Sequence, residues 1–209
     1  RRSIWGRVRS ELTTAWQTED HPRERLTVAD EREHVIFYLA EVLYRLVPAF
    51  YDEIAQALEK AYGVQAESLV LPTIIRFGSW VGGDMDGNPD VHAKTLRDTL
   101  ARQQQVIVNA YFNDCQSLAQ ALSQSASRIG VSPALMQRIE EYATLIPSAQ
   151  AITPSRHDRM PYRVFLGQVA ERLRYTYDGR PNCYENPSQF RRDNQVIAAS
   201  LLAIRGRHA

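Results

Sequence analysis

The chain has 209 residues, of which 44% are hydrophobic and 23% are charged. This composition is typical of folded globular proteins and excludes disordered and fibrous classes. With 25 basic and 24 acidic side chains the formal net charge is +1, which gives no reason to expect a nucleic-acid or an acidic membrane partner. No apolar run reaches the roughly 18 residues that a membrane-spanning helix needs, so we expect no membrane insertion.

The chain opens on Arg1 and Arg2 instead of methionine. We expect that it was trimmed, processed or excised from something longer. Its first residues also lack the apolar stretch of a signal peptide. The two cysteines, Cys115 and Cys183, are too few for a disulfide framework, which favours a reducing, cytoplasmic setting.

Apolar residues at helical spacing predict that most of the chain is helical. Asp30 is expected to cap the second helix, with Glu33 completing a capping box. Pro48 should kink or break that helix, and Gly63 should end its continuation. Ser132 and Pro133 resemble a helix start. The helices are expected at about residues 4–17, 30–62, 92–124, 133–146, 161–178 and 188–206.

One segment differs in character. Residues 73–80 are rich in β-branched and aromatic side chains and run into glycines, a pattern that predicts a short strand. The expected fold class is therefore mainly α with one short strand near 73–80, in a single helical unit spanning residues 1–209. Because an isolated strand cannot satisfy its own backbone groups, this one should need partners from outside the chain.

The loop at residues 77–90, "FGSWVGGDMDGNPD", holds four glycines and three aspartates. Gly82 and Gly83 permit positive φ and close backbone approach. Asp84 and Asp86 are two residues apart, so they would share a face in extended geometry. The loop is then expected to carry chemistry, with the helix start behind it able to present N–H groups to an anion.

This loop has two further interpretations, a simpler structural one and a more specific metal-binding one. The simpler one is an ordinary strand-to-helix turn, in which Asp and Asn side chains bind local backbone. The more specific one is a calcium loop, since Asp84, Asp86 and Asn88 stand at alternate ligand positions. It fails because Pro89 and Thr95 occupy the places where an EF-hand needs glycine and glutamate. No dinucleotide-binding or P-loop motif is present either.

The loop sequence "FGSWVGGDMDGNP" closely resembles the F-x-S-W-M-G-G-D-R-D-G-N-P signature of phosphoenolpyruvate carboxylase. Other segments resemble this family in the same order along the chain, so that the chain is identified as a member over essentially its whole length. These segments are "LTTAWQTEDHPRERLTVADE", "VLYRLVPAFYDEIAQAL", "PYRVFLGQVAERLRYT" and "LLAIRGRHA".

The resemblance implies a cytoplasmic lyase that joins phosphoenolpyruvate and bicarbonate, with Mg²⁺ or Mn²⁺, to give oxaloacetate and phosphate. This carbon dioxide fixation feeds the tricarboxylic acid cycle. The family's fold is mostly helical around an eight-stranded α/β barrel, in an allosteric homotetramer, and the strand near 73–80 would be one stave of that barrel. An apolar pocket must keep water from the enolate intermediate.

The family's motif also assigns residues of the loop. Trp80 matches the tryptophan associated with the CO₂/bicarbonate pocket. The other matching positions, expected to shape the rim of the active site, are Gly82, Gly83, Asp84, Asp86, Gly87 and Asn88. Two departures stand out: Met85 replaces the signature's arginine, and Asp20-His21-Pro22 replaces an acidic-isoleucine-arginine run. An arginine that serves as an activator site in some members corresponds to Arg172 or Arg174, although helix packing is the favoured role.

The family's catalytic histidine motif, T-A-H-P-T-E, does not occur in this sequence. Its metal-binding carboxylates and phosphate arginines belong to segments beyond Ala209. We therefore expect no catalytic residue and no metal site in this chain, and no carboxylation by the chain alone. Its main partner should be the remainder of the same polypeptide. The alternative is a stand-alone helical module that binds an anion or a protein through the glycine loop.

Overall fold

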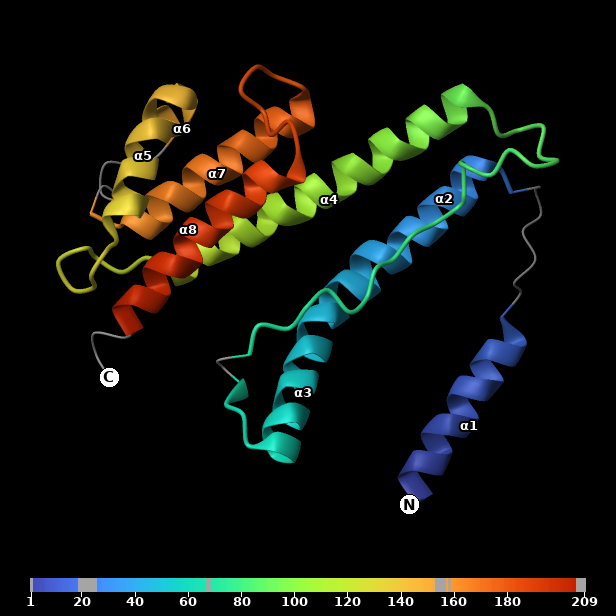
Figure 1. The fold of residues 1–209 in the computed structure, drawn as a ribbon. Helices are drawn as coiled ribbons and strands as arrows, with labels where there is room; N and C mark the ends of the chain where they lie inside the picture. Colours follow the sequence, from blue (N-terminus) through green and yellow to red (C-terminus); the bar gives the residue numbers. More distant parts are fainter. Residues whose placement is uncertain (1, 19–25, 67–68, 153–156, 158, 206–209) are drawn as a thin grey trace.

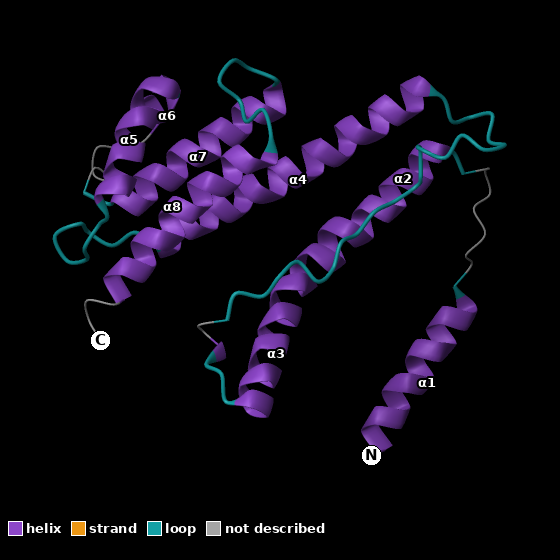
Figure 2. Cartoon of the chain, in the orientation of Figure 1, coloured by secondary structure: helices purple, strands orange, loops and turns teal. Residues whose placement is uncertain are grey.

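The structure, a computed structural model, describes residues 2–18, 26–66, 69–152, 157 and 159–205. Within these ranges the regular secondary structure is helical throughout (Figures 1 and 2), which confirms the mainly α prediction. The elements are α1 (Arg2–Gln17), α2 (Val28–Phe37), the π-helix η1 (Tyr38–Leu43), α3 (Tyr44–Tyr62), α4 (Ala93–Ala121), α5 (Pro133–Leu145), α6 (Pro147–Ile152), α7 (Pro161–Asp178) and α8 (Pro187–Arg205).

The helix starts follow local side-chain chemistry. Ser132 caps α5 as predicted, accepting a hydrogen bond from the Leu135 N–H at 3.2 Å. The prediction that Asp30 caps α2 is wrong, because Thr27 is the N-cap and Asp30 is the third residue of the helix. The Thr27 N–H donates to Asp30 Oδ2 at 2.9 Å, and the Asp30 N–H donates back to Thr27 Oγ1. This capping box begins the helix three residues earlier than the sequence suggested.

The long helix of the N-terminal half does not end at its proline. α3 continues through Pro48 to the left-handed Gly63, whose φ is +69°. The π-helical turn η1 comes immediately before α3. Such turns are mostly single insertions within α-helices, so α2, η1 and α3 form one continuous helical line (Figure 1).

The predicted strand near 73–80 is wrong. Residues 69–79 are extended but carry no strand pairing among the described residues, and they run alongside the α2–α3 line (Figure 1). The Ile74 N–H donates instead to the Tyr51 hydroxyl at 2.7 Å. The residue types favour extended backbone, but a strand also needs a neighbouring strand, and the described chain offers only helices.

The main core lies in the C-terminal half, where α7 packs along α4 and is covered by α5, α6 and α8 (Figure 1). Phe165 of α7 is fully buried there, as are Tyr162 and Val169. Cys115 of α4 joins this core, and burial raises the pKa of its thiol to about 12. The bundle therefore packs around the later part of α4, and the loop at residues 77–90 leads into the start of this helix.

A carboxylate stands at the centre of the bundle. Asp193 is completely buried and accepts hydrogen bonds from Arg138 Nε at 2.9 Å and from the Tyr184 hydroxyl at 2.7 Å. The Tyr142 hydroxyl also donates to it, and Arg172 donates to Tyr142 at 2.8 Å. These charged and phenolic groups satisfy one another, which is the condition for keeping a charge in a protein interior.

The tyrosines of this network keep their protons at neutral pH. Burial, together with the adjacent Asp193, raises the pKa of Tyr142 to about 12. The pKa of Tyr184 is raised as well, first by burial and then by its neighbours Tyr142 and Asp193. Both hydroxyls therefore remain hydrogen-bond donors to the carboxylate across the physiological range.

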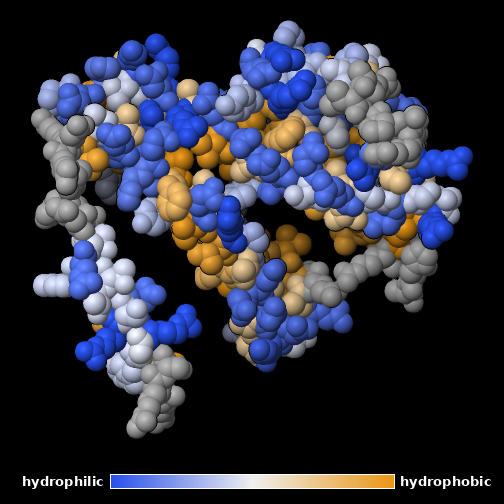
Figure 3. All heavy atoms as spheres, turned by 180° about the vertical axis from the view of Figure 1, so that it is seen from behind, coloured by the Kyte–Doolittle hydropathy of each residue, from blue (hydrophilic) through white to orange (hydrophobic). Residues whose placement is uncertain are grey.

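The N-terminal half is much less covered. α1 contacts no other helix among the described residues, and its apolar side chains Trp5 and Trp16 are 73% and 91% exposed. The α2–α3 line also exposes Phe37 and Leu46, and Figure 3 shows hydrophobic side chains gathered along this region. None of the described helices is both long and apolar enough to cross a bilayer.

Candidate functional site

The loop at residues 77–90 lies where α2 and α4 begin, at the end of the molecule farthest from α5 and α6 (Figure 1). Its large apolar side chains point outward: Trp80 is 78% exposed and Met85 is 60% exposed. An apolar indole held in this way is available to line a neighbouring pocket. Its role as part of a CO₂/bicarbonate pocket stays a prediction.

A tight turn fixes the backbone on either side of Trp80. The Trp80 carbonyl accepts hydrogen bonds from the N–H groups of Gly83, at 2.9 Å, and of Asp84, at 3.0 Å. Gly82 is buried within the turn with φ +78°, a conformation that favours glycine. Gly83 does not adopt positive φ, so only one of the two adjacent glycines is required for that reason.

The acidic and amide side chains of the loop bind the loop's own backbone. Asp84 Oδ1 accepts the Asp86 N–H at 3.1 Å, and Asn88 Oδ1 accepts the Asp90 N–H at 3.0 Å. Gly87, at φ +72°, lies between these two turns with open space around it. The chain is bent here, so the extended geometry in which Asp84 and Asp86 would share a face is not present. The simpler interpretation of these residues, as turn formers, describes their contacts.

The start of α4 is capped by its own side chains. His92 Nδ1 accepts the Thr95 N–H at 3.2 Å, and the Thr95 hydroxyl donates to the Asp90 carbonyl at 3.0 Å. Val91 is buried beneath this cap. The helix therefore begins at the residue that the sequence predicts. One of the N–H groups that an anion would need is already engaged.

The described residues do not gather a metal ligand set. Among them, no three His, Cys, Asp or Glu side chains lie close enough together to hold a metal ion. Asp84 and Asp86 are the acidic pair nearest to Trp80 in sequence, and one oxygen of Asp84 is engaged in the turn.

An apolar groove of about 380 Å³ opens beneath the beginning of the loop. Phe77 and Ser79 form one side of it, and α2, η1 and α4 form the others, with Leu39, Tyr44 and Ile107 among the lining residues. Sequence reasoning missed this groove. The available signal was the segment "VIFYLAEVLYRLV" at residues 35–47, whose apolar side chains occupy more than one face of a helix.

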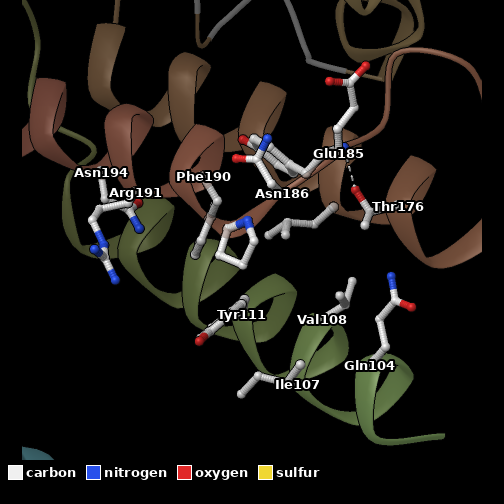
Figure 4. A pocket seen from close by; sticks show the side chains of 13 residues that line it. Gln104, Ile107, Val108, Tyr111, Thr176, Glu185, Asn186, Phe190, Arg191 and Asn194 are labelled. Atoms are coloured by element: carbon white, nitrogen blue, oxygen red, sulfur yellow. Dashed lines mark hydrogen bonds between the residues drawn. The ribbon is translucent and has the colours of Figure 1, made fainter. Parts of the chain in front are cut away.

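A second pocket, of about 410 Å³, lies between α4, α7 and α8 (Figure 4). Tyr111 and Phe190 stack in its wall with ring centroids 4.9 Å apart, and Gln104 and Asn194 stand at its ends (Figure 4). Residues 77–90 do not line it. Since its lining joins α4 to the α7–α8 region much later in the chain, no local pattern could have predicted it.

The two arginines considered as an activator site have different surroundings. Arg172 is buried and donates to the Asn182 carbonyl at 3.0 Å and to Gln189 Oε1 at 2.8 Å, in addition to the network around Asp193. Arg174 is partly exposed and pairs with Glu171 at 2.7 Å. Arg172 therefore has a packing role, which agrees with the favoured interpretation.

Comparison with known proteins extends the resemblance beyond the loop. The family model for phosphoenolpyruvate carboxylase matches residues 1–203. The phosphoenolpyruvate carboxylase of Xanthomonas campestris pv. campestris (strain 8004) is 45% identical over 97% of this chain and 22% of its own length. That of Xanthomonas oryzae pv. oryzae (strain MAFF 311018) is 44% identical over 100% of the chain and 23% of its own length.

A more distant relative, the phosphoenolpyruvate carboxylase of Paraburkholderia xenovorans (strain LB400), is 34% identical over 95% of the chain and 21% of its own length. No solved structure matches the chain. The chain thus spans less than a quarter of the length of these relatives. Because the family model covers nearly all of its residues, including the whole loop around Trp80, the chain belongs to the phosphoenolpyruvate carboxylase family.

Proposed function

We propose that this chain is a segment of a phosphoenolpyruvate carboxylase, an enzyme that joins phosphoenolpyruvate and bicarbonate to give oxaloacetate and phosphate. The loop at residues 77–90 contributes a wall of the CO₂/bicarbonate pocket, and the helices form a scaffold for it. The observation that carries this proposal is the outward-facing Trp80, 78% exposed on a hydrogen-bonded turn in a chain that matches the family over residues 1–203.

The physical role of Trp80 is to provide apolar surface next to reacting groups. An enolate exposed to water is protonated before it can attack CO₂, so the site needs a dry wall at that point. An indole supplies a large flat apolar area. The Trp80 carbonyl is held by the N–H groups of Gly83 and Asp84, which limits the freedom of the backbone that carries the indole.

Other parts of the proposal concern the longer enzyme. We propose Mg²⁺ or Mn²⁺ as its cofactor, which would stabilise negative charge on the enolate oxygen, and we assign no residue of this chain to that ion. Asp84, Asp86, Gly87 and Asn88 would shape the rim of the site. The enzyme would be a cytoplasmic, allosteric homotetramer, and the main partner of this segment would be the remainder of the same polypeptide.

The segment alone is expected to be inactive. The purified chain, supplied with phosphoenolpyruvate, bicarbonate and Mg²⁺, should form no oxaloacetate above the background without protein, because the family's catalytic histidine motif is not part of its sequence. A coupled assay that follows oxaloacetate reduction would measure this. Turnover proportional to the concentration of the segment would contradict the expectation.

Replacing Trp80 by alanine in the longer carboxylase should lower kcat/KM for bicarbonate by roughly a hundredfold, since a displaced reacting group can cost that much. Trp80→Phe, which keeps an apolar ring, should lose much less. Because Trp80 is exposed, the same change in the isolated segment should alter its free energy of unfolding by less than about 0.5 kcal/mol. Steady-state kinetics and urea unfolding would measure the two effects.

Tyr62 provides the matched control, since it is an aromatic side chain at the end of α3 that is 76% exposed. Tyr62→Ala should leave kcat/KM unchanged. Equal activity of the Trp80→Ala enzyme and the unmodified enzyme would remove Trp80 from the pocket. An alternative role for the loop, in binding a partner protein or an anion, would then become the better hypothesis.

A further inference from the structure

A close approach between the loop and the helix behind it joins Gly82 to Thr99 of α4. A Cβ atom placed on Gly82 would lie 2.3 Å from Thr99 Oγ1 and 3.1 Å from Thr99 Cβ. Real Cβ atoms do not make contacts of 2.3 Å, so a hydrogen atom is all that fits between the two residues. The turn that carries Trp80 is thus pressed directly against the second turn of the helix.

Thr99 is unusual in its own right. It is 3% exposed, and within the described part of the chain its hydroxyl oxygen has no hydrogen-bond partner. A helical threonine commonly donates to the carbonyl three or four residues earlier, as Thr176 does to the Arg172 carbonyl at 2.9 Å. A buried hydroxyl without a partner is destabilising, so packing alone would be served better by valine.

The small size of an oxygen atom explains why residue 99 carries a hydroxyl and not a second methyl group. An oxygen atom is smaller than a methyl group, and Oγ1 is the Thr99 atom nearest to the place where Gly82 would carry a Cβ. Valine would put a methyl group in that position and push the turn away from α4, which is the overpacking that close-packed interiors resist. Serine would keep the oxygen and remove only the methyl group, whose carbon lies 3.3 Å from the same place.

We propose that Thr99 is a positioning residue of the carboxylase site. Its small hydroxyl oxygen allows Gly82 to pack directly against α4. This contact fixes the turn between Trp80 and Asp84 and so sets the position of the indole. Thr99 itself touches no substrate. The proposal rests on the proposed function, because it deepens the role of the Trp80 loop in the same site.

The test compares Thr99→Val with Thr99→Ser in the longer carboxylase, and Ser117→Ala serves as the control. Ser117 is also on α4 but is exposed and donates only along its own helix, to the Asn113 carbonyl at 3.0 Å. Hydrogen–deuterium exchange of peptides covering residues 80–90 reports on the turn without any need for activity. Steady-state kinetics with varied bicarbonate and varied phosphoenolpyruvate report on the site.

Thr99→Val should speed exchange of the Gly83 and Asp84 amides about tenfold and lower kcat/KM for bicarbonate by about ten- to a hundredfold, with little change in KM for phosphoenolpyruvate. Thr99→Ser and Ser117→Ala should resemble the unmodified enzyme in both measurements. A merely structural threonine predicts the opposite order, with valine at least as good as serine.

Unchanged amide exchange in Thr99→Val would overturn the claim that the Thr99 hydroxyl holds the turn through its contact with Gly82. Faster exchange with unchanged kinetics would overturn the positioning role. The Trp80→Ala enzyme separates this failure from failure of the proposed function: if that variant is also fully active, the loop has no part in the site. If Trp80→Ala is impaired while Thr99→Val is not, only the inference about Thr99 fails.

Discussion

Replacing Asp193 by alanine should destabilise the isolated chain by about 3–5 kcal/mol, the cost of removing one partner from a buried charged pair. Asp193 is completely buried and accepts hydrogen bonds from Arg138 and Tyr184 as well as from Tyr142. Its loss leaves the guanidinium groups of Arg138 and Arg172 without their shared counter-charge. Urea unfolding followed by far-ultraviolet circular dichroism would measure the difference.

Two further variants make this result specific. Asp193→Asn keeps the shape and one acceptor oxygen, so its effect should be smaller than that of alanine but still well above about 1 kcal/mol. Asp178 pairs with Arg180 at 2.7 Å on the surface, with side chains 33% and 48% exposed, and Asp178→Ala should cost less than about 1 kcal/mol. Equal effects of Asp193→Ala and Asp178→Ala would mean that the buried network does not stabilise the bundle.

Replacing Gly82 by alanine should release the loop from α4. Two effects disfavour the new side chain. The φ of +78° costs about 1–2 kcal/mol for a residue with a Cβ. The Cβ would also lie 2.3 Å from Thr99 Oγ1. Together the strain and the overpacking amount to about 2–4 kcal/mol of local stability. Since about 1.4 kcal/mol is a factor of ten, the Gly83 and Asp84 amides should exchange at least about tenfold faster.

Gly87 is the matched control, because it has a similar φ of +72° but nothing within 4 Å of the place where a Cβ would stand. Gly87→Ala should bear only the conformational strain, and exchange at Gly83 and Asp84 should stay unchanged. The longer enzyme should lose more activity with Gly82→Ala than with Gly87→Ala. If the two substitutions speed exchange equally, contact with Thr99 contributes nothing to holding the turn.

The loop shows how far sequence reasoning reaches for the site. The residue types of "FGSWVGGDMDGNP" predicted a glycine turn that leads into a helix. The likeness to the carboxylase signature identified the family. The roles of single residues were less accessible. The spacing of Asp84 and Asp86 did not show that Asp84 accepts a hydrogen bond from the Asp86 N–H, which bends the chain between them. Thr99, 17 positions after Gly82 in the sequence, carried no local signal at all.

The helices and the family could be read from the amino-acid order alone, because both depend on information that is local in the chain. Helical spacing of apolar residues, the Ser132–Pro133 start and the glycines at 63 and 179 act over a few residues, and the structure has helices at those places. A thirteen-residue signature is local in the same sense. Its specificity does not depend on knowing what surrounds it.

Features that depend on neighbours brought from afar required the folded chain. Residues 69–79 have the composition of a strand, yet the partner that the fold gives the Ile74 N–H is the Tyr51 hydroxyl on a helix, so the segment is extended and forms no strand ladder with the described residues. Asp193 is an ordinary acidic residue on a helix until Arg138 and Tyr142 are placed beside it. Pairing and burial are properties of contacts between distant residues, here between α3 and the extended segment beside it and among α5, α7 and α8.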